Sequence, residues 1–246
     1  IPDKMVISLK GKRALYKNDL MMLEMIAHAD WTRPIYVALT VGSENYMNLG
    51  DNFIQEGLAN RITPFLTNQP GAKNFDTEKT YRNVMYRYKY GGLEKPGLYI
   101  DETVLRMCYT HRHIFSQLAL HLIEEGQKAK ALKVLQKAEK VLPTYNVPMN
   151  YMSGGAEIAR AYALLGQKAK AMQTINAVWK DAYQYAVYYL GLNDNWFTMS
   201  QRDIMIQLSI LTQINDITQL VDKQLYAKRR TMIDRLYSTY IGKGGQ

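Results

Sequence analysis

The chain has 246 residues, of which 47% are hydrophobic and 22% charged, a composition typical of a folded protein and not of a disordered one. Its single cysteine, Cys108, excludes a scaffold of intrachain disulfides. No apolar run approaches the roughly 20 residues needed to cross a bilayer, so the sequence predicts a chain that is soluble by itself.

The formal net charge is +9, and it is unevenly placed. Residues 1–70 carry seven basic and seven acidic side chains, whereas residues 71–246 carry 24 basic against 15 acidic. A basic face attracts phosphate backbones, anionic membrane surfaces or acidic partners. A solvated helix face is the more ordinary cause of such an excess, so charge alone assigns no partner.

The first 70 residues predict a small mixed α/β unit. A strand, a helix and a strand in this order favour a βαβ unit with a parallel pair. The predicted helix at 20–27 is apolar on nearly every side, so we expect other parts of the unit to cover most of its surface. The expected elements are a strand at 5–9, a helix at 20–27, and strands at 35–41 and 57–65 on either side of a short helix at 43–53.

An internal repeat is the strongest signal in the chain. The hexapeptide Gly-Gln-Lys-Ala-Lys-Ala occurs at 126–131 and again at 166–171. Gly126 permits a tight turn between two helices, Pro143 ends the second helix, and Tyr183 stands where the second copy would need its proline. The first copy has the spacing of a tetratricopeptide repeat, carried by Phe115, Leu118, Ala119, Leu122, Ala131, Leu135 and Ala138.

Two such repeats leave apolar faces open, so further helices must cap them. We expect these in 204–211 and 217–236, and a preceding helix that Asp101 caps and that buries Cys108 on its apolar stripe. The predicted fold class is α+β, mainly α, with the small N-terminal mixed α/β unit followed by a tetratricopeptide-like helical hairpin stack. The predicted division is 1–70 for the first unit, 71–100 for a connecting segment and 101–241 for the helical domain.

No catalytic signature is present: the sequence lacks a nucleophile elbow, a phosphate-binding glycine loop and a dinucleotide fingerprint. We therefore predict no catalytic residue and no cofactor. His113 and His121 are more than two helical turns apart, so one helix cannot offer both to one ion, and no metal site is expected. Ser153-Gly154-Gly155 could bind an anion before a helix, but a loop that starts the second repeat is the simpler interpretation.

Binding is the better functional hypothesis. The first helix of each repeat lines the inner groove of a helical hairpin stack. The groove residues so predicted are His113, Ser116, Leu120, Glu124, Ala156 and Arg160. A second candidate is an aromatic cluster of Tyr185, Tyr188, Tyr189 and Trp196, which could stack on sugars or peptide aromatics or could fill a joint between helices. Residues 81–90 alternate tyrosine with basic residues. This pattern suits stacking on the bases of a single-stranded nucleic acid, but a half-buried strand shows it too, so nucleic-acid binding is disfavoured.

The sequence also resembles the Bacteroidetes-type multi-pass membrane proteins related to protein O-mannosyltransferases, long known as a domain of unknown function. The segments that carry the resemblance are 17–23, 31–38, 56–61, 91–93, 99–103 and 115–122. The resemblance implies the C-terminal soluble region of a glycosyltransferase that uses a lipid-linked sugar donor, on the periplasmic side of the inner membrane. Its catalytic acidic residues would lie in the membrane portion, so none is carried over to this chain.

Three hypotheses follow. The first is a non-catalytic accessory region that binds a polypeptide acceptor or a protein partner and contacts the membrane portion of its own parent chain. The second is a free-standing tetratricopeptide-type adaptor that binds peptides. The third is a soluble enzyme whose site has no recognisable motif.

Overall fold

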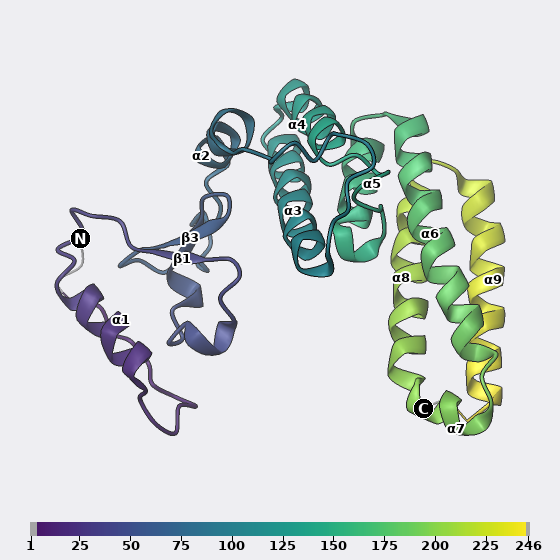
Figure 1. The fold of residues 1–246 in the computed structure, drawn as a ribbon, viewed down its shortest axis with the longest axis horizontal. Helices are drawn as coiled ribbons and strands as arrows, with labels where there is room; N and C mark the ends of the chain where they lie inside the picture. The colour runs from purple at the N-terminus through teal and green to yellow at the C-terminus, as the bar shows by residue number, and fades with distance from the viewer. Residues whose placement is uncertain (1–3, 245–246) are drawn as a thin grey trace. The chain divides into compact units, whose positions relative to one another are not determined.

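The computed structural model describes residues 4–244 and divides into two compact units, one ending at Lys89 and the other beginning at Tyr90 (Figure 1). The division falls within residues 71–100, the segment that the sequence predicts to connect the two parts. The predicted class, α+β and mainly α, is confirmed. No helix among the described residues combines the length and apolar character needed to cross a bilayer.

The first unit contains a three-stranded antiparallel sheet in the order β1-β3-β2. The expected parallel βαβ unit is therefore wrong. The two strands expected to be parallel correspond to β1 and β3, and they pair antiparallel. The segment between them holds β2 where the prediction had a crossover helix. Only three residues join β2 to β3, so these two form an antiparallel hairpin, since a parallel pair needs a crossover of about a dozen residues. The elements are α1 (Lys17–Ala27), β1 (Tyr36–Ala38), η1 (Ser43–Asn45), η2 (Gly50–Asn52), β2 (Phe53–Gln55), β3 (Ala59–Ile62), α2 (Thr77–Arg82) and the π-helix η3 (Asn83–Arg87).

Four further expectations in this unit are corrected. Residues 5–9 form no strand, although Met5 and Ile7 pack against the core of the unit. The expected helix at 43–53 is reduced to two 3-10 turns, and most of the tyrosine-rich segment 81–90 is helical instead of extended. Helix α1 is less covered than its sequence predicts, because Leu20, Met21 and Met25 are each more than half exposed.

The second unit is helical. Asp101 caps its first helix, as predicted, by accepting hydrogen bonds from the backbone N–H groups of Thr103 and Val104 at 2.8 and 3.0 Å. The same helix buries Cys108, also as predicted, and burial raises the pKa of this thiol. The elements are α3 (Glu102–Glu124), α4 (Lys128–Val141), η4 (Tyr151–Ser153), α5 (Gly155–Leu164), α6 (Lys168–Leu190), α7 (Asp194–Met199), α8 (Gln201–Gln219) and α9 (Lys223–Gly242).

The two copies of the hexapeptide form the same turn. Gly126 and Gly166 have φ of 76° and 72°, in the left-handed region that glycine adopts at little cost. The following glutamine N–H closes each turn, from Gln127 to the carbonyl of Leu122 at 2.7 Å and from Gln167 to that of Tyr162 at 2.9 Å. The repeat in sequence is therefore a repeat in conformation, which joins α3 to α4 and α5 to α6.

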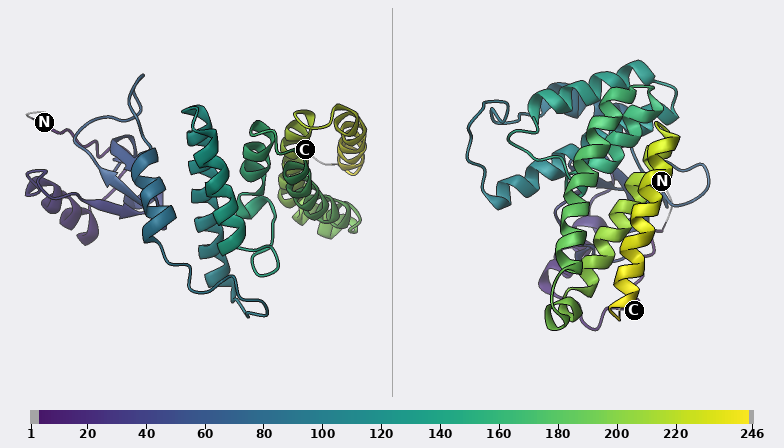
Figure 2. Two further views of the ribbon diagram at one scale, coloured as in Figure 1. Left: turned by 90° about the horizontal axis from the view of Figure 1, so that it is seen from above. Right: turned by 90° about the vertical axis from the view of Figure 1, so that its right-hand side faces the viewer.

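A third helical pair covers the second hairpin. Helix α5 packs on α3, α6 and α8, and α6 packs on both α8 and α9. Figure 2 shows α6, α8 and α9 running side by side. The predicted caps at 204–211 and 217–236 thus correspond to α8 and α9, with the turn between them displaced to the residues around Val221.

Candidate functional site

The first helices of the three hairpins enclose a hollow of about 360 Å³. Helices α3 and α5 contact each other, and α5 contacts α8, so all three present side chains to one surface. The hollow is lined by Leu120 of α3, by Ala156, Glu157 and Arg160 of α5, and by Gln213, Asp216, Ile217 and Leu220 at the C-terminal end of α8. We call this surface the α3–α5–α8 hollow.

Three of the six predicted groove residues meet in the hollow: Leu120, Ala156 and Arg160. Ser116 does not, because it is fully buried and donates its hydroxyl hydrogen to the carbonyl of His113 at 2.8 Å. His113 instead has its Nε2 3.0 Å from the carbonyl oxygen of Met152. Glu124 is exposed one turn beyond the hollow, where its Oε2 is 3.5 Å from Nδ1 of His121.

The hollow combines charged groups with an apolar edge. Glu157 and Asp216 are acidic and Arg160 is basic, while Leu220 is 57% exposed at the rim. The Oε2 atom of Glu157 is buried and has no hydrogen-bond partner within the described part of the chain. An unsatisfied buried carboxylate oxygen is costly, so the hydrogen bonding of Glu157 is incomplete within the described part of the chain.

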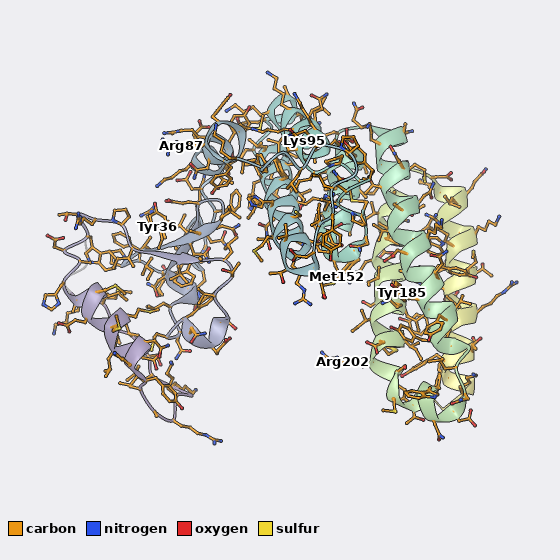
Figure 3. All side chains as sticks on the ribbon, in the orientation of Figure 1. Tyr36, Arg87, Lys95, Met152, Tyr185 and Arg202 are labelled. Carbon is orange, nitrogen blue, oxygen red and sulfur yellow. The ribbon has the colours of Figure 1, made fainter. Side chains whose placement is uncertain are left out.

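Three of the four residues of the predicted aromatic cluster, Tyr185, Tyr188 and Tyr189, lie together in the last turns of α6, and the fourth, Trp196, lies on α7. Tyr185 and Tyr189 stack with ring centroids 6.2 Å apart, and Tyr188 meets Tyr189 edge-on at 5.4 Å. Tyr189 also packs against the apolar cluster around Phe197, and burial raises its pKa. Tyr185, Tyr188 and Trp196 are 49%, 62% and 59% exposed, so only part of the cluster fills the joint between helices. Figure 3 places Tyr185 on the lower half of α6, with Arg202 of α8 pointing away from that helix.

Sequence reasoning missed a second pocket, of about 440 Å³, between α4 and α6. Arg112 of α3 lies in it with 1% of its surface exposed. The signal in the sequence was available: Arg112 stands four residues after Cys108 and three before Phe115, on the apolar stripe of the helix. A charged residue at such a position needs polar partners, and the sequence does not identify them.

A polar cluster in the first unit was missed as well. Glu56 is 4% exposed and accepts hydrogen bonds of 2.6 Å from the Tyr36 hydroxyl and from Nε of Arg61, while Nζ of Lys79 lies 2.6 Å away. Burial acts to raise the pKa of Glu56, but the bonds from Lys79, Tyr36 and Arg61 outweigh it and hold this pKa below its ordinary value. The carboxylate is saturated by its own neighbours, so the cluster joins the sheet to α2 and leaves little capacity for a ligand.

Within residues 4–244 no three histidine, cysteine, aspartate or glutamate side chains are grouped so that they could hold a metal ion. Burial lowers the pKa of His111.

Gly154 of the Ser153-Gly154-Gly155 segment has φ of 77° and leads from η4 into α5, which is the loop role that the sequence predicts.

A family model matches the N-terminal part of the chain. Residues 1–79 match the model described as TMEM260-associated domain 2. The match supports a relation to a family of membrane proteins and says nothing of a sugar or an activity. It covers the part that contains α1, the sheet and the Glu56 cluster. Helices α3 to α9 lie outside it, so the tetratricopeptide assignment stays a prediction. No curated protein and no solved structure matches the chain.

Proposed function

We propose that this chain is the non-catalytic soluble C-terminal region of a membrane-bound, protein O-mannosyltransferase-like glycosyltransferase, and that its α3–α5–α8 hollow binds a polypeptide acceptor. On this proposal the region lies on the periplasmic side of the inner membrane, next to the membrane portion of its parent chain. The family match at residues 1–79 supports the parentage. The hollow supports the binding role.

One observation carries the binding role: side chains from three successive helical pairs meet on one surface. Stacked helical hairpins form an extended inner surface of this kind, on which a segment of polypeptide can lie across several helices. Leu120, Ile217 and Leu220 offer apolar contacts for side chains of a bound segment. The surface therefore has the two properties that an extended peptide needs, apolar sites and polar groups between them.

The polar groups suit a peptide more than a compact charged ligand. A peptide main chain presents N–H donors at regular intervals, and the acidic side chains of Glu157 and Asp216 in the lining are acceptors. Gln213 is already held in place, because its Oε1 accepts a hydrogen bond from the Tyr151 hydroxyl at 3.1 Å. Arg160 remains exposed beside these acceptors, so it can pair with an acidic side chain of the acceptor.

The test is a matched pair of charge reversals in the parent membrane protein, Arg160→Glu in the hollow and Lys133→Glu on α4 outside it. Both residues are exposed basic side chains on helices of the same unit. We expect Arg160→Glu to reduce sugar transfer to acceptor polypeptides about tenfold and Lys133→Glu to leave it unchanged. Quantitative mass spectrometry of the glycosylated peptides measures both.

Equal transfer by the two variants and the unmodified protein would contradict the binding role. Peptide binding by the isolated chain, lost in Arg160→Glu but without any associated transfer activity in cells, would favour the free-standing adaptor instead. Sugar turnover by the isolated chain would favour the hypothesis of a soluble enzyme.

A further inference from the structure

The pocket between α4 and α6 is separate from the hollow and has a different character. Its volume of about 440 Å³ lies in the range of small-molecule sites. The segment after α4 closes one side of it, and Asn146 in that segment donates hydrogen bonds to the carbonyls of Leu93 and Lys95 at 2.7 and 2.6 Å. Half of its sixteen lining residues are apolar: Leu135, Ala138, Leu142, Pro143, Pro148, Met149, Ile158 and Ala177.

Arg112 places a buried positive charge in the lining of this pocket. Its Nη1 donates to the carbonyl of Pro148 at 2.7 Å, and its Nη2 donates to those of Leu142 and Val147 at 2.9 and 2.6 Å. These bonds use three of the five N–H groups of a guanidinium. No carboxylate within residues 4–244 pairs with Arg112, and burial lowers its pKa to about 10. The charge is thus held by carbonyl dipoles alone.

A second buried arginine of the same unit, Arg229, has its guanidinium covered by other side chains and serves as a comparison for Arg112. Arg229 is 6% exposed and, as for Arg112, burial lowers its pKa to about 10. Its guanidinium donates to Asn176 Oδ1 at 2.7 Å and stacks on the Trp179 ring, whose centroid is 4.4 Å away. An aromatic face covers Arg229, whereas Arg112 borders open volume.

The rim of the pocket leaves its net charge positive. Glu139 and Lys170 pair there at 3.0 Å, and the Tyr162 hydroxyl donates to Glu139 Oε1 at 2.8 Å. These two charges cancel, so Arg112 supplies a net charge of one. A ligand that complements this pocket has one negative charge and an apolar body, because a more highly charged anion would leave water for a lining that offers only one uncompensated positive charge.

We propose that the pocket between α4 and α6 binds a monocarboxylate with an apolar body, whose carboxylate accepts hydrogen bonds from Arg112. An aliphatic acid and the C-terminus of a short apolar peptide share this chemistry. The carboxylate supplies the counter-charge that the described residues do not, and the aliphatic lining covers the rest of the ligand. This site is independent of peptide binding in the hollow.

The test uses octanoate and N-acetyl-Val-Leu as probes, with octanamide and the C-terminally amidated dipeptide as neutral partners of the same shape. Isothermal titration of the whole chain measures their affinities. We expect at least one acid to bind about tenfold or more tightly than its amide, since the amide lacks the charge that Arg112 complements. Preference for octanoate identifies an aliphatic acid, and preference for the dipeptide identifies a peptide C-terminus.

Substitutions of charged residues at the rim test whether binding depends on the net positive charge of the pocket, and they leave Arg112 in place. Glu139→Gln removes a negative charge beside the pocket and should strengthen binding of the acid about threefold, while Lys170→Gln should weaken it by a similar factor. Arg112→Gln should abolish the preference for the acid, and the matched variant Arg229→Gln should retain it. Circular dichroism of each variant checks the fold.

The proposal is overturned if acid and amide bind equally, or if neither acid binds at millimolar concentration. It is also overturned if a folded Arg112→Gln variant keeps the preference. Should Arg112→Gln fail to fold, the opposite shifts of Glu139→Gln and Lys170→Gln decide, because shifts in the same direction or none would contradict a charge-selective pocket.

Discussion

The two hairpins that carry the repeated hexapeptide, α3–α4 and α5–α6, begin alike and end differently. Both turns are made by the same hexapeptide, with Gly126 and Gly166 in the same left-handed conformation. The second helix of the first hairpin, α4, ends at Val141, two residues before Pro143, after 14 residues. Its counterpart α6 has Tyr183 at the equivalent place and continues to Leu190, over 23 residues.

The difference in length is tied to a difference in surface. Where α4 stops, the chain turns back over α3, and three of its carbonyls accept hydrogen bonds from Arg112, which creates the pocket between α4 and α6. Where α6 continues, its last turns pack against α8 and carry the exposed aromatic side chains. The second helix thus ends beside the pocket in the hairpin that has the proline, and continues into the aromatic turns in the hairpin that lacks it.

The largest effect should come from making the second hairpin end as the first does. Tyr183→Pro removes a helical hydrogen bond in the interior of α6 and places the ring against the preceding turn, at a cost of about 3 kcal/mol or more. Packing of the later turns against α8 would weaken as well. Urea unfolding followed by circular dichroism measures the loss. Tyr183→Ala is the control, since it removes the stacking on Trp179 but keeps the helix; equal losses in both variants would show that the helix is not what matters.

The next largest effect compares equivalent core positions. Leu135 is 1% exposed and Ile175, forty residues later, is fully buried. Ile175→Ala should cost about 3 to 4 kcal/mol, because the cavity it leaves is closed. Leu135→Ala should cost less, about 2 kcal/mol, because Leu135 borders the pocket and its cavity opens into existing volume. Urea unfolding of both variants checks the order, and a larger loss for Leu135→Ala would contradict the open pocket.

Much of the second unit could be predicted from the sequence because its signals are local. The repeated hexapeptide predicts two equal turns, Asp101 predicts a helix start, and Cys108 predicts a buried stripe; the structure confirms all three. Each depends on a few neighbouring residues, whose backbone conformation and periodicity decide the outcome. The end of α6 was less clear, since the absence of a proline does not say where a helix stops.

The first unit was harder because its strands are three or four residues long. Strand pairing depends on contacts between separate segments, and a run of apolar residues does not reveal its partner or its direction. Phe53 was assigned to the end of a helix and the next two residues to no element, although Phe53–Gln55 pairs with Ala59–Ile62 in a hairpin. The clusters around Glu56 and Arg112 share this limitation, because their partners are distant in sequence or are main-chain carbonyls.

A smaller effect is expected at the two glycines of the repeated turn. A Cβ at Gly126 or Gly166 would meet no atom within 4 Å, so substitution costs only the backbone strain of a positive φ. Gly126→Ala and Gly166→Ala should each destabilise the unit by about 1 kcal/mol, and by similar amounts. Asparagine at either position should cost less, because it tolerates this conformation. Urea midpoints of the four variants measure this, and a difference well above 1 kcal/mol between the two alanine variants would break the equivalence of the turns.

The smallest effect on stability is expected at Tyr162, which is the counterpart of Leu122 in the first hairpin. Tyr162 has a hydroxyl group and Leu122 has none. Burial, followed by its hydrogen bond to Glu139, raises the pKa of Tyr162. Tyr162→Phe should cost about 1 kcal/mol at neutral pH, since it removes this bond and leaves Glu139 paired with Lys170.

The same substitution has a defined dependence on pH. A pKa raised on folding contributes stability that is fully present below the pKa of the unfolded tyrosine, about 10, and is lost as the pH rises toward the folded value. The difference in the free energy of unfolding between the unmodified chain and Tyr162→Phe should therefore be constant at neutral pH, shrink above about pH 10 and then reverse.

Urea unfolding between pH 7 and 11 measures this difference between the two proteins, in which the contributions of the other tyrosines cancel. A difference that stays constant to pH 11 would mean that Tyr162 ionises as readily in the folded protein as in the unfolded one, and that its hydroxyl is not held in the buried bond that distinguishes the second hairpin from the first.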